Sequence, residues 1–441
     1  MDNYWKNGIL GVVVGDALGC PVQFEDRDVV AEHPVKGMRG YGTFNLPEGT
    51  WTDDSSLTLA LLDSIVQTDK LDLKHIMNNY VDWFDNGAFT PFGVSFDIGM
   101  GTMRAIAAYK HRPNPHQCGS FDERNNGNGS LMRIMPACLY CYEQGLEDKE
   151  AIRQIHLIGG LTHAHIRSNI ACGLYYFMIK AVLSGRGFTF KDRLREGLEQ
   201  GFSYYEKTLA DHENLAYYSR LRDLNQFAET PEERIRSTGY VVDTLEAAVW
   251  SLMTTDTFEN ALLKAVNLGD DSDTVGAIAG GLAGLGYGIG GIGGIPQNWI
   301  DAIQRKEWIL GLCEAVSNRL DKRVKDTKPC VGFSMADAQE AYKHMDKQLI
   351  QDYGRTCGTN ILHTWDDGHR VLFRCKNCHG YILLQFSEFH GMEDDSYYAD
   401  YFPVAGPTEA KEINERFDGE AIEEEFPHKW LIADHVPHWN R

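Results

Sequence analysis

The sequence lacks an excess of positive charge. It has 42 Lys and Arg residues against 63 Asp and Glu residues, so its formal net charge is −21 at pH 7. Nonspecific binding to nucleic acid or to an anionic membrane needs a basic surface. The composition therefore argues against both as general functions, and it leaves open only a local basic groove.

A convincing signal peptide is also missing, because Asp16 interrupts the apolar run Ile9–Val14. The ten cysteines are scattered apart from two Cys-x-x-Cys pairs. We therefore expect a cytoplasmic protein with free thiols. The uncharged run Val275–Ile295 is about long enough to span a bilayer, but its many glycines favour a buried helix and a loop.

Strand-like alternation of apolar and polar residues is missing from the first 320 residues. Apolar residues recur there at helical spacing, for example in Leu57–Ile65 and Ile170–Ala181. The glycines of Gly8–Gly19 fall three or four residues apart, which suits a helix packed closely against others. The residues predict an all-α fold with functional loops at the helix ends, in a chain long enough for two or three domains.

The most unusual segment is Gly269–Thr274, which places three carboxylates and two hydroxyls within six residues. Neighbouring carboxylates repel one another and lose hydration when they are buried, so such a cluster needs solvent or a cation. Ligand sets made only of oxygen suit Mg²⁺, Ca²⁺ or Mn²⁺ rather than zinc. An acidic cap on the following helix is the alternative, because Asp and Ser favour the first helical turn.

A second cluster of this kind, Thr52–Ser56, also lies directly before a helical pattern. Two such helix N-termini brought together would form a compact site lined by oxygens, which suits two metal ions.

Three further motifs can be interpreted either as functional or as local structure. Asp97 is either a functional carboxylate or a helix cap. Gly127–Ser130 either holds a phosphate or forms a simple turn, and Thr162–His165 offers either metal ligands or a cap.

With these motifs in order, the chain from about Tyr4 to Leu320 resembles the ADP-ribosylglycohydrolases. This family includes the dinitrogenase-reductase-activating glycohydrolases and the ADP-ribosylhydrolases. The order and spacing of the motifs carry the resemblance, since no single motif is specific. The matching motifs are Gly15–Gly19, Trp51–Ser55, Asp97–Gly99, Gly127–Ser130, Thr162-His163, Gly239–Val241 and Leu268–Gly276.

The resemblance implies an all-α orthogonal helical bundle over residues 1–328, with two Mg²⁺ or Mn²⁺ ions in a central cleft. By position, the implied metal ligands are Thr52, Asp53, Asp54, Asp271, Asp273 and Thr274. The implied ADP-ribose-binding residues are Gly127, Asn128, Gly129, Ser130, His163 and Tyr240. Asp97 would lie near the glycosidic bond that is cut.

Members of this family remove ADP-ribose from a modified side chain, often arginine or serine, or cleave related esters. The chemistry of the residues agrees, because glycoside hydrolysis needs an activated water and a carboxylate that moves a proton. The sequence therefore predicts a Mg²⁺-dependent hydrolase that cuts the N- or O-glycosidic bond of an ADP-ribosylated protein or an ADP-ribose derivative.

One position departs from the family pattern. Many members carry a Glu seven residues after the Asp of the first motif, and this chain has Gln23 there, with Glu25 two residues further on. An amide can orient a water but cannot accept its proton, so the role of base would pass to Asp97 or Glu25. The alternative function is a bacterial immunity protein that binds ADP-ribose, a toxin or a cognate ADP-ribosyltransferase. A third is a metal-dependent phosphohydrolase.

Residues 329–441 have a different texture and predict a small α+β module. Asp337–Tyr353 predicts one amphipathic helix, and Val371–Phe373 with Tyr381–Phe386 predicts a hairpin around a Cys-x-x-Cys turn, as in half of a zinc ribbon. The module would contact a protein partner or cover the cleft. The cysteines are either free or hold Zn²⁺, and the candidate ligands are Cys357, Cys375 and Cys378 with His363, His369 or His379.

Overall fold

The computed structural model describes residues 3–185, 189–210, 212–325, 329–345, 347–349, 368–375, 377–378, 380–390, 395–417, 422, 430–432 and 437–439. The chain divides into two compact units, Met1–Ser317 and Asn318–Arg441. The division falls within helix α16 (Lys306–Lys325), shortly before the boundary at residue 328 that the sequence predicts. That boundary stays a prediction.

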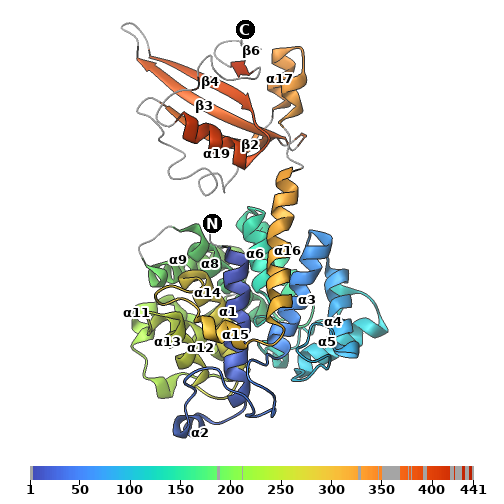
Figure 1. Cartoon of the computed structure of the whole chain (residues 1–441), viewed down its shortest axis with the longest axis vertical. Coiled ribbons are helices and arrows are strands. Elements are labelled where there is room, and N and C mark those ends of the chain that lie inside the picture. Colours follow the sequence, from blue (N-terminus) through green and yellow to red (C-terminus); the bar gives the residue numbers. More distant parts are fainter. Residues whose placement is uncertain are drawn as a thin grey trace. The chain divides into compact units, whose positions relative to one another are not determined.

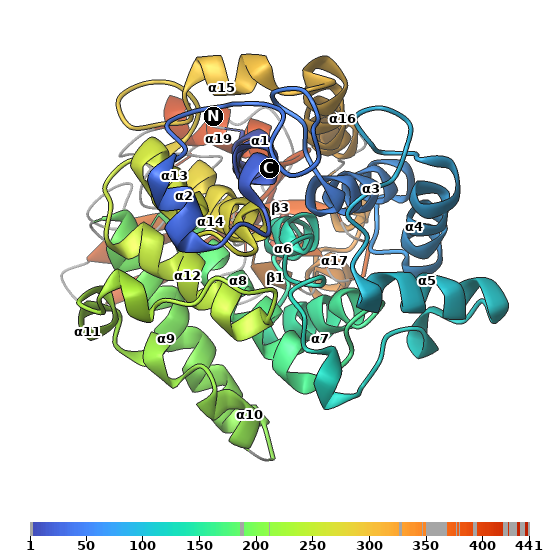
Figure 2. The same cartoon turned by 90° about the horizontal axis from the view of Figure 1, so that it is seen from below.

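In the described part of the first unit the regular elements are helices, so the predicted all-α class is confirmed (Figures 1 and 2). In chain order they are α1 (Tyr4–Gly19), α2 (Arg27–Glu32), α3 (Asp53–Thr68), α4 (Leu73–Asn86), α5 (Met100–His111), α6 (Met135–Glu143), α7 (Asp148–Gly159), α8 (Ile166–Ser184), α9 (Phe190–Thr208), α10 (Glu213–Ala216), α11 (Leu224–Ala228), α12 (Val241–Met253), α13 (Phe258–Val266), α14 (Ser272–Tyr287), α15 (Gln297–Ala302) and α16.

Helices α1 and α14 form an antiparallel pair at the centre of this unit (Figures 1 and 2). Glycines let their backbones touch: a Cβ added at Gly11 would collide with the carbonyl oxygen of Gly280, and one at Gly15 with that of Gly276. A Cβ at Gly19 would meet the backbone of Ser272. The C-terminal end of α1 therefore lies against the N-terminal end of α14, where the acidic segment begins.

The uncharged run that includes α14 is a buried helix followed by a loop, as the glycines predicted. Among the described helices, none is both long and apolar enough to cross a membrane.

The second unit combines short helices with one antiparallel sheet in its described residues, which confirms the α+β class. The strands follow one another across the sheet in chain order. Apolar side chains on one sheet face pack against α19, and those on the other face pack against α17. The elements are α17 (Ala338–His344), β1 (Lys347–Leu349), β2 (Gly368–Cys375), β3 (Tyr381–His390), β4 (Asp395–Pro403), α19 (Pro407–Arg416), β5 (Leu431–Ile432) and β6 (His438–Trp439).

One predicted element is wrong. The helix expected over Asp337–Tyr353 ends at His344, and residues 347–349 form strand β1, paired with β2. The carbonyl of His344 accepts hydrogen bonds from Asn377 Nδ2 at 2.7 Å and from Cys375 Sγ at 3.3 Å. These hydrogen bonds from the end of β2 and the turn after it use the carbonyl of His344, and the helix ends there. The sequence pattern of the helix itself does not record them.

Candidate active site

The two acidic clusters meet where α3 and α14 begin. Thr52 Oγ1 lies 3.2 Å from Asp273 Oδ2 and donates a hydrogen bond to it. The segment after α1 is bonded to the same place by two backbone hydrogen bonds. Asp270 N donates to the carbonyl of Glu25 at 2.9 Å, and Phe24 N donates to the carbonyl of Asp270 at 2.6 Å. Segments more than two hundred residues apart in sequence therefore form one acidic site.

Asp16, on the last turn of α1, fixes the start of α3 in this site. Its carboxylate accepts hydrogen bonds from Thr52 N and Ser55 N at 3.0 Å and from Ser55 Oγ at 2.5 Å. The side chain is fully buried, and burial raises its pKa to about 7 even though these hydrogen bonds lower it. Asp16 therefore positions the metal-ligand candidates of α3 from behind.

The carboxylates of Asp53, Asp54 and Asp273 are buried side by side. Burial raises the pKa of each well above its ordinary value, and the charges of the neighbouring carboxylates raise it further. Two buried oxygens, Oδ2 of Asp54 and Oδ1 of Asp273, have no hydrogen-bond partner among the described residues. No ion pair joins a carboxylate of this site to a described Lys or Arg. Oxygens that repel one another and have free lone pairs fit a divalent cation.

Helix capping explains only part of this arrangement. Thr52 is the N-cap of α3, and its hydroxyl accepts from Asp54 N at 3.4 Å. Asp271 is at the N-cap position of α14, yet its side chain makes no capping hydrogen bond. Its oxygens instead accept from Asn128 Nδ2 at 2.5 Å and from Thr274 Oγ1 at 3.4 Å. The side chain of Asp271 therefore bonds to Asn128 and Thr274 and does not cap the backbone of α14.

Asp97 is not a cap either, because Gly99 occupies the N-cap position of α5. It has a left-handed backbone with φ of 55°, an uncommon conformation for a residue with a side chain. Its carboxylate accepts a 2.8 Å hydrogen bond from Gln23 Nε2. Burial raises the pKa of Asp97 to about 6, and the bond from Gln23 opposes the rise. A carboxyl with this pKa can exchange a proton near neutral pH.

Gln23 and Glu25 differ in what they bring to the site. Gln23 is buried, and its Oε1 has no partner among the described residues, so it can still accept a hydrogen bond. Glu25 is half-buried, and its backbone carbonyl is bonded to Asp270. The structure therefore places Gln23 directly against Asp97, and it holds Glu25 by the main chain.

The loop Gly127–Ser130 reaches the same acidic site. Asn128 N donates to the carbonyl of Gly239 at 3.0 Å, and Val241 N donates to that of Asn126 at 3.0 Å, so the loop pairs with the segment around Tyr240. The side chain of Asn128 links the loop to Asp271. Sequence motifs more than one hundred residues apart are thus brought together.

His163 lies under this loop. A Cβ added at Gly129 would be 2.7 Å from His163 Cε1, so the position has no room for a side chain. Burial, together with the nearby charge of Arg133, lowers the pKa of His163 to about 3, so the ring is neutral. Arg133 itself is fully buried and donates to Tyr80 and Thr162. Therefore neither His163, which is neutral, nor Arg133, which is buried, presents an exposed positive charge at the loop.

Sequence reasoning missed the cation that lies beside the loop, Arg167. Its guanidinium stacks on the ring of Tyr217, 3.6 Å from the centroid, and donates to Tyr240 Oη at 3.2 Å. It also pairs with Glu123 at 3.1 Å. An Arg two residues after His165 in the first turn of α8 has no distinguishing local pattern. Only the packing of α8 against the segments around Tyr217 and Tyr240 places it here.

An apolar groove lies on the side of Asp97 and Gln23, with a volume of about 480 Å³. Rings join its parts: Phe24 meets Phe44 at 6.3 Å between centroids, and Phe44 meets Phe96 at 5.3 Å. Phe24 follows Gln23 in the sequence and Phe96 precedes Asp97, so these rings lie next to the acidic site. The lining residues are Phe44, Leu46, Pro47, Phe92, Val94 and Phe96.

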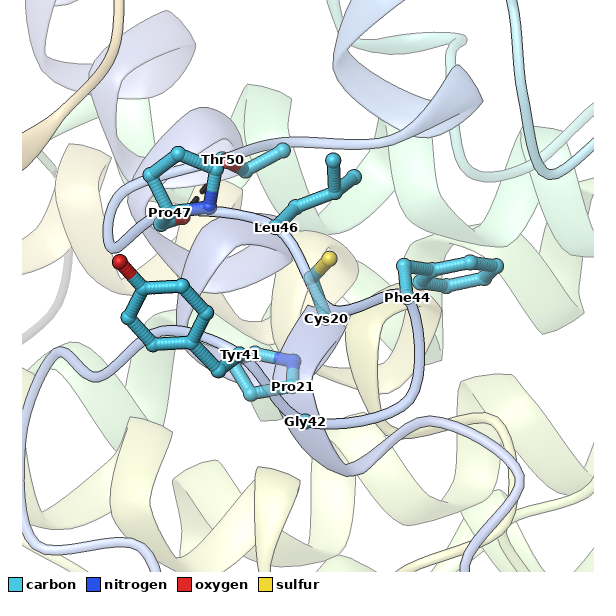
Figure 3. Close-up of a pocket in the computed structure, with 8 residues that line it drawn as sticks. All are labelled: Cys20, Pro21, Tyr41, Gly42, Phe44, Leu46, Pro47 and Thr50. Carbon is cyan, nitrogen blue, oxygen red and sulfur yellow. Dashed lines mark hydrogen bonds between the residues drawn. The ribbon is translucent and has the colours of Figure 1, made fainter.

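The loop that carries Phe44 is packed against the end of α1. Figure 3 shows Tyr41, Leu46 and Pro47 of this loop around a small hollow beside Cys20 and Pro21. The hollow between them has a volume of about 10 Å³, about the space of one water. The apolar groove therefore has one wall that is held firmly beside the acidic site.

Comparison with known proteins identifies the family of this chain. The profile of the ADP-ribosylglycohydrolase family matches residues 5–326. ADP-ribosylarginine hydrolase Tri1 of Pseudomonas putida (strain GB-1) is 32% identical over 316 residues, which are 71% of this chain and 78% of that protein. ADP-ribosyl-[dinitrogen reductase] glycohydrolase of Rhodospirillum rubrum is 29% identical over 67% of this chain and 89% of its own length.

A solved structure, an ADP-ribosylglycohydrolase-related protein complex, is similar in fold. It aligns with a TM-score of 0.56 and 31% sequence identity, covering 71% of this chain and 96% of that chain. The residues that the family profile matches include the whole acidic site. The chain belongs to the ADP-ribosylglycohydrolase family.

Proposed function

We propose that this protein is a metal-dependent hydrolase that removes ADP-ribose from a modified protein side chain. The observation that carries the proposal is Asp97, a carboxyl with a pKa of about 6, beside buried carboxylates whose charge no described basic residue balances. That combination supplies a group for proton transfer and a site for divalent cations. The relatives named as ADP-ribosyl hydrolases support the substrate class.

The residues that would hold the cations are Thr52, Asp53, Asp54, Asp271, Asp273 and Thr274. Their all-oxygen set fits two Mg²⁺ or Mn²⁺ ions better than zinc. When bound, such ions orient ribose hydroxyls and lower the pKa of a water. Asp16 keeps the first turn of α3 in place behind them through Thr52 and Ser55.

Other residues of the chain would then bind ADP-ribose and transfer the proton. Gly127, Asn128, Gly129 and Ser130 hold the diphosphate, and the neutral ring of His163 supports that loop from below. Arg167 adds a positive charge next to Tyr240, which faces the nucleotide. Asp97 accepts or donates the proton at the glycosidic bond. Gln23 orients Asp97 with its amide N–H and offers its free oxygen to a water.

The apolar groove beside Asp97 would receive the target protein. A free nucleotide is polar and would gain little from contact with a groove of about 480 Å³ lined by Phe, Val, Leu and Pro. Apolar surface near a polar site is typical of protein recognition. The relative from Pseudomonas putida is an ADP-ribosylarginine hydrolase, so we propose arginine as the linkage. A cytoplasmic location follows from the same proposal, because the target would be an intracellular protein.

The second candidate function is a binding or immunity protein, and the residue that favours it is Gln23. If the reaction needs a carboxylate at that position, the site would hold ADP-ribose or an ADP-ribosyltransferase without turnover. Both functions predict ADP-ribose binding, so only the products separate them.

The test is to incubate the purified protein with peptides carrying ADP-ribose on arginine or on serine, with Mg²⁺ or with EDTA, and to identify the products by mass spectrometry. Metal-dependent release of intact ADP-ribose and unmodified peptide is the expected result. Tight binding of ADP-ribose without product would favour the immunity protein. Release of phosphate or AMP would instead indicate a phosphohydrolase.

A further inference from the structure

A cluster of three thiols and one imidazole lies in the second unit and shares no residue with the acidic site. It consists of Cys330, His344, Cys375 and Cys378, and one potential ligand atom from each lies within 4.8 Å of the others. Cys330 and Cys375 are buried, and His344 and Cys378 are half-buried. Soft sulfur with imidazole nitrogen is the ligand set that zinc prefers in structural sites.

Three separate segments bring these side chains together. Cys375 ends β2, and Cys378 is in the turn that Cys375 N closes by donating to the carbonyl of Gly380 at 2.8 Å. Cys330 lies beside that turn, because its N–H donates to the carbonyl of Tyr381 at 3.1 Å. A Cβ at Gly380 would be 2.5 Å from Cys330 Cα, so the approach depends on glycine.

His344 is the last residue of α17 and completes the cluster from the other side. Its carbonyl is held by Asn377 Nδ2 and by Cys375 Sγ, the contacts that end the helix. Its Nε2 is buried and has no hydrogen-bond partner among the described residues. A buried imidazole nitrogen without a partner, next to three thiols, has an unused lone pair for a metal ion.

The spacing of the sulfurs fits a tetrahedral site. Sγ of Cys378 lies 3.6 Å from Sγ of Cys330. Two sulfurs bound at about 2.3 Å to one tetrahedral zinc would be about 3.8 Å apart. Gly332 N donates to Cys330 Sγ at 3.4 Å, which favours a thiolate at this position.

We propose that Cys330, His344, Cys375 and Cys378 hold one structural Zn²⁺ ion. The ion ties α17 and the segment at Cys330 to the turn between β2 and β3. With four protein ligands the ion has no open position, so its role is to stabilise the fold of this unit rather than to catalyse.

This ligand set differs from the one expected from the sequence. Cys375 and Cys378 remain, and their partners are Cys330 and His344. Cys357, His363 and His379 lie outside the described residues, and of His369 the structure describes the backbone in β2. The sequence could not identify Cys330 and His344, because each comes from a segment with no metal-binding spacing.

The experiment is metal analysis of the full-length protein, purified under reducing conditions without added metal and dialysed against a weak chelator. We expect one zinc per chain in the wild type and near zero in Cys378→Ser and in His344→Ala. Cys118→Ser, which changes a buried thiol of the first unit, and Asp273→Asn should both keep one zinc. Replacement by Co²⁺ should give the visible bands of a tetrahedral cobalt thiolate.

Several outcomes would overturn the proposal. Wild-type protein without zinc would do so, as would a Cys330–Cys378 disulfide found by mass spectrometry in place of the metal. Equal zinc in the wild type and Cys378→Ser would show that the metal is bound elsewhere. If the variants fail to fold, the cobalt spectrum of the wild type still decides. The result does not depend on the proposed hydrolase activity.

Discussion

Nε2 of Gln23 donates a 2.8 Å hydrogen bond to Oδ2 of Asp97, so an uncharged amide touches the carboxyl with the pKa of about 6. A hydrogen bond to the charged form of a carboxyl lowers its pKa. The amide therefore helps to keep Asp97 ionised near neutral pH without adding a second negative charge. We therefore propose that Gln23 positions Asp97.

Gln23→Met should move the pH dependence of catalysis. Without the N–H donor, the pKa of Asp97 should rise above about 6, so the acid limb of the kcat profile should shift upward by about one pH unit. Kinetics from about pH 5 to pH 9 would measure the shift. Gln67→Met, at an exposed position on α3, is the control. An unchanged acid limb with a lower plateau would mean that Gln23 acts on substrate and not on Asp97.

The apolar groove should matter only for protein substrates. Phe92→Ser combined with Val94→Ser should raise KM for an ADP-ribosylated protein by about tenfold, which corresponds to about 1.4 kcal/mol of lost apolar contact. KM for ADP-ribosylated arginine, which is too small to fill the groove, should stay the same. Val29→Ser removes an exposed apolar side chain elsewhere and should change neither constant. Equal losses for both substrates would argue against a docking role.

The acidic site should make stability depend on pH and on metal. Burial raises the pKa values of Asp16 to about 7 and of Asp97 to about 6 and raises those of the other site carboxyls, from 3.8. The folded state therefore binds protons more tightly than the unfolded state. These groups favour folding fully below about pH 4, and that contribution is lost as the pH rises through about 6 to 7.

A divalent cation binds the ionised form, so its effect should run the other way. The rise in Tm caused by Mg²⁺, relative to EDTA, should be larger at about pH 8 than at about pH 5. Differential scanning calorimetry measures both values. Asp54→Asn combined with Asp273→Asn should reduce the Mg²⁺ effect and raise Tm in EDTA at the higher pH. A Mg²⁺ effect that shrinks with rising pH would contradict the account.

The central helix pair should not tolerate a methyl group at its contact. Gly280→Ala places a Cβ against the carbonyl of Gly11, and the free energy of unfolding should fall by more than about 2 kcal/mol. Gly311→Ala is the matched control, since its Cβ would meet nothing within 4 Å in α16. It should be neutral or stabilise by about 0.5 to 1 kcal/mol. Urea unfolding of both variants gives the comparison, and equal effects would remove the close contact from the account.

Much of the fold and part of the site could be predicted from the sequence. Helical periodicity gave the all-α class, and the glycine spacing in α1 indicated its close packing. The two acidic clusters stood out because each concentrates carboxylates and hydroxyls at one helix start. The two clusters meet at Thr52 and Asp273.

Other features depend on tertiary contacts that no local pattern records. Arg167 is marked as functional only by its stacking on Tyr217 and its bond to Tyr240. The role of Asp16 likewise depends on tertiary contacts, because its hydrogen bonds to Thr52 and Ser55 join the end of α1 to the start of α3. The early end of α17 depends in the same way on the turn after β2.

The most direct test of the central claim is release of ADP-ribose from an ADP-ribosylarginine peptide by the wild type and by Asp273→Asn, across a titration with Mg²⁺. The account predicts that the wild type is active only with the metal and that EDTA abolishes its activity. It predicts a loss of at least about a hundredfold in kcat for Asp273→Asn at saturating Mg²⁺. Release that is unaffected by EDTA, or near-wild-type activity of Asp273→Asn, would contradict a metal site at these carboxylates.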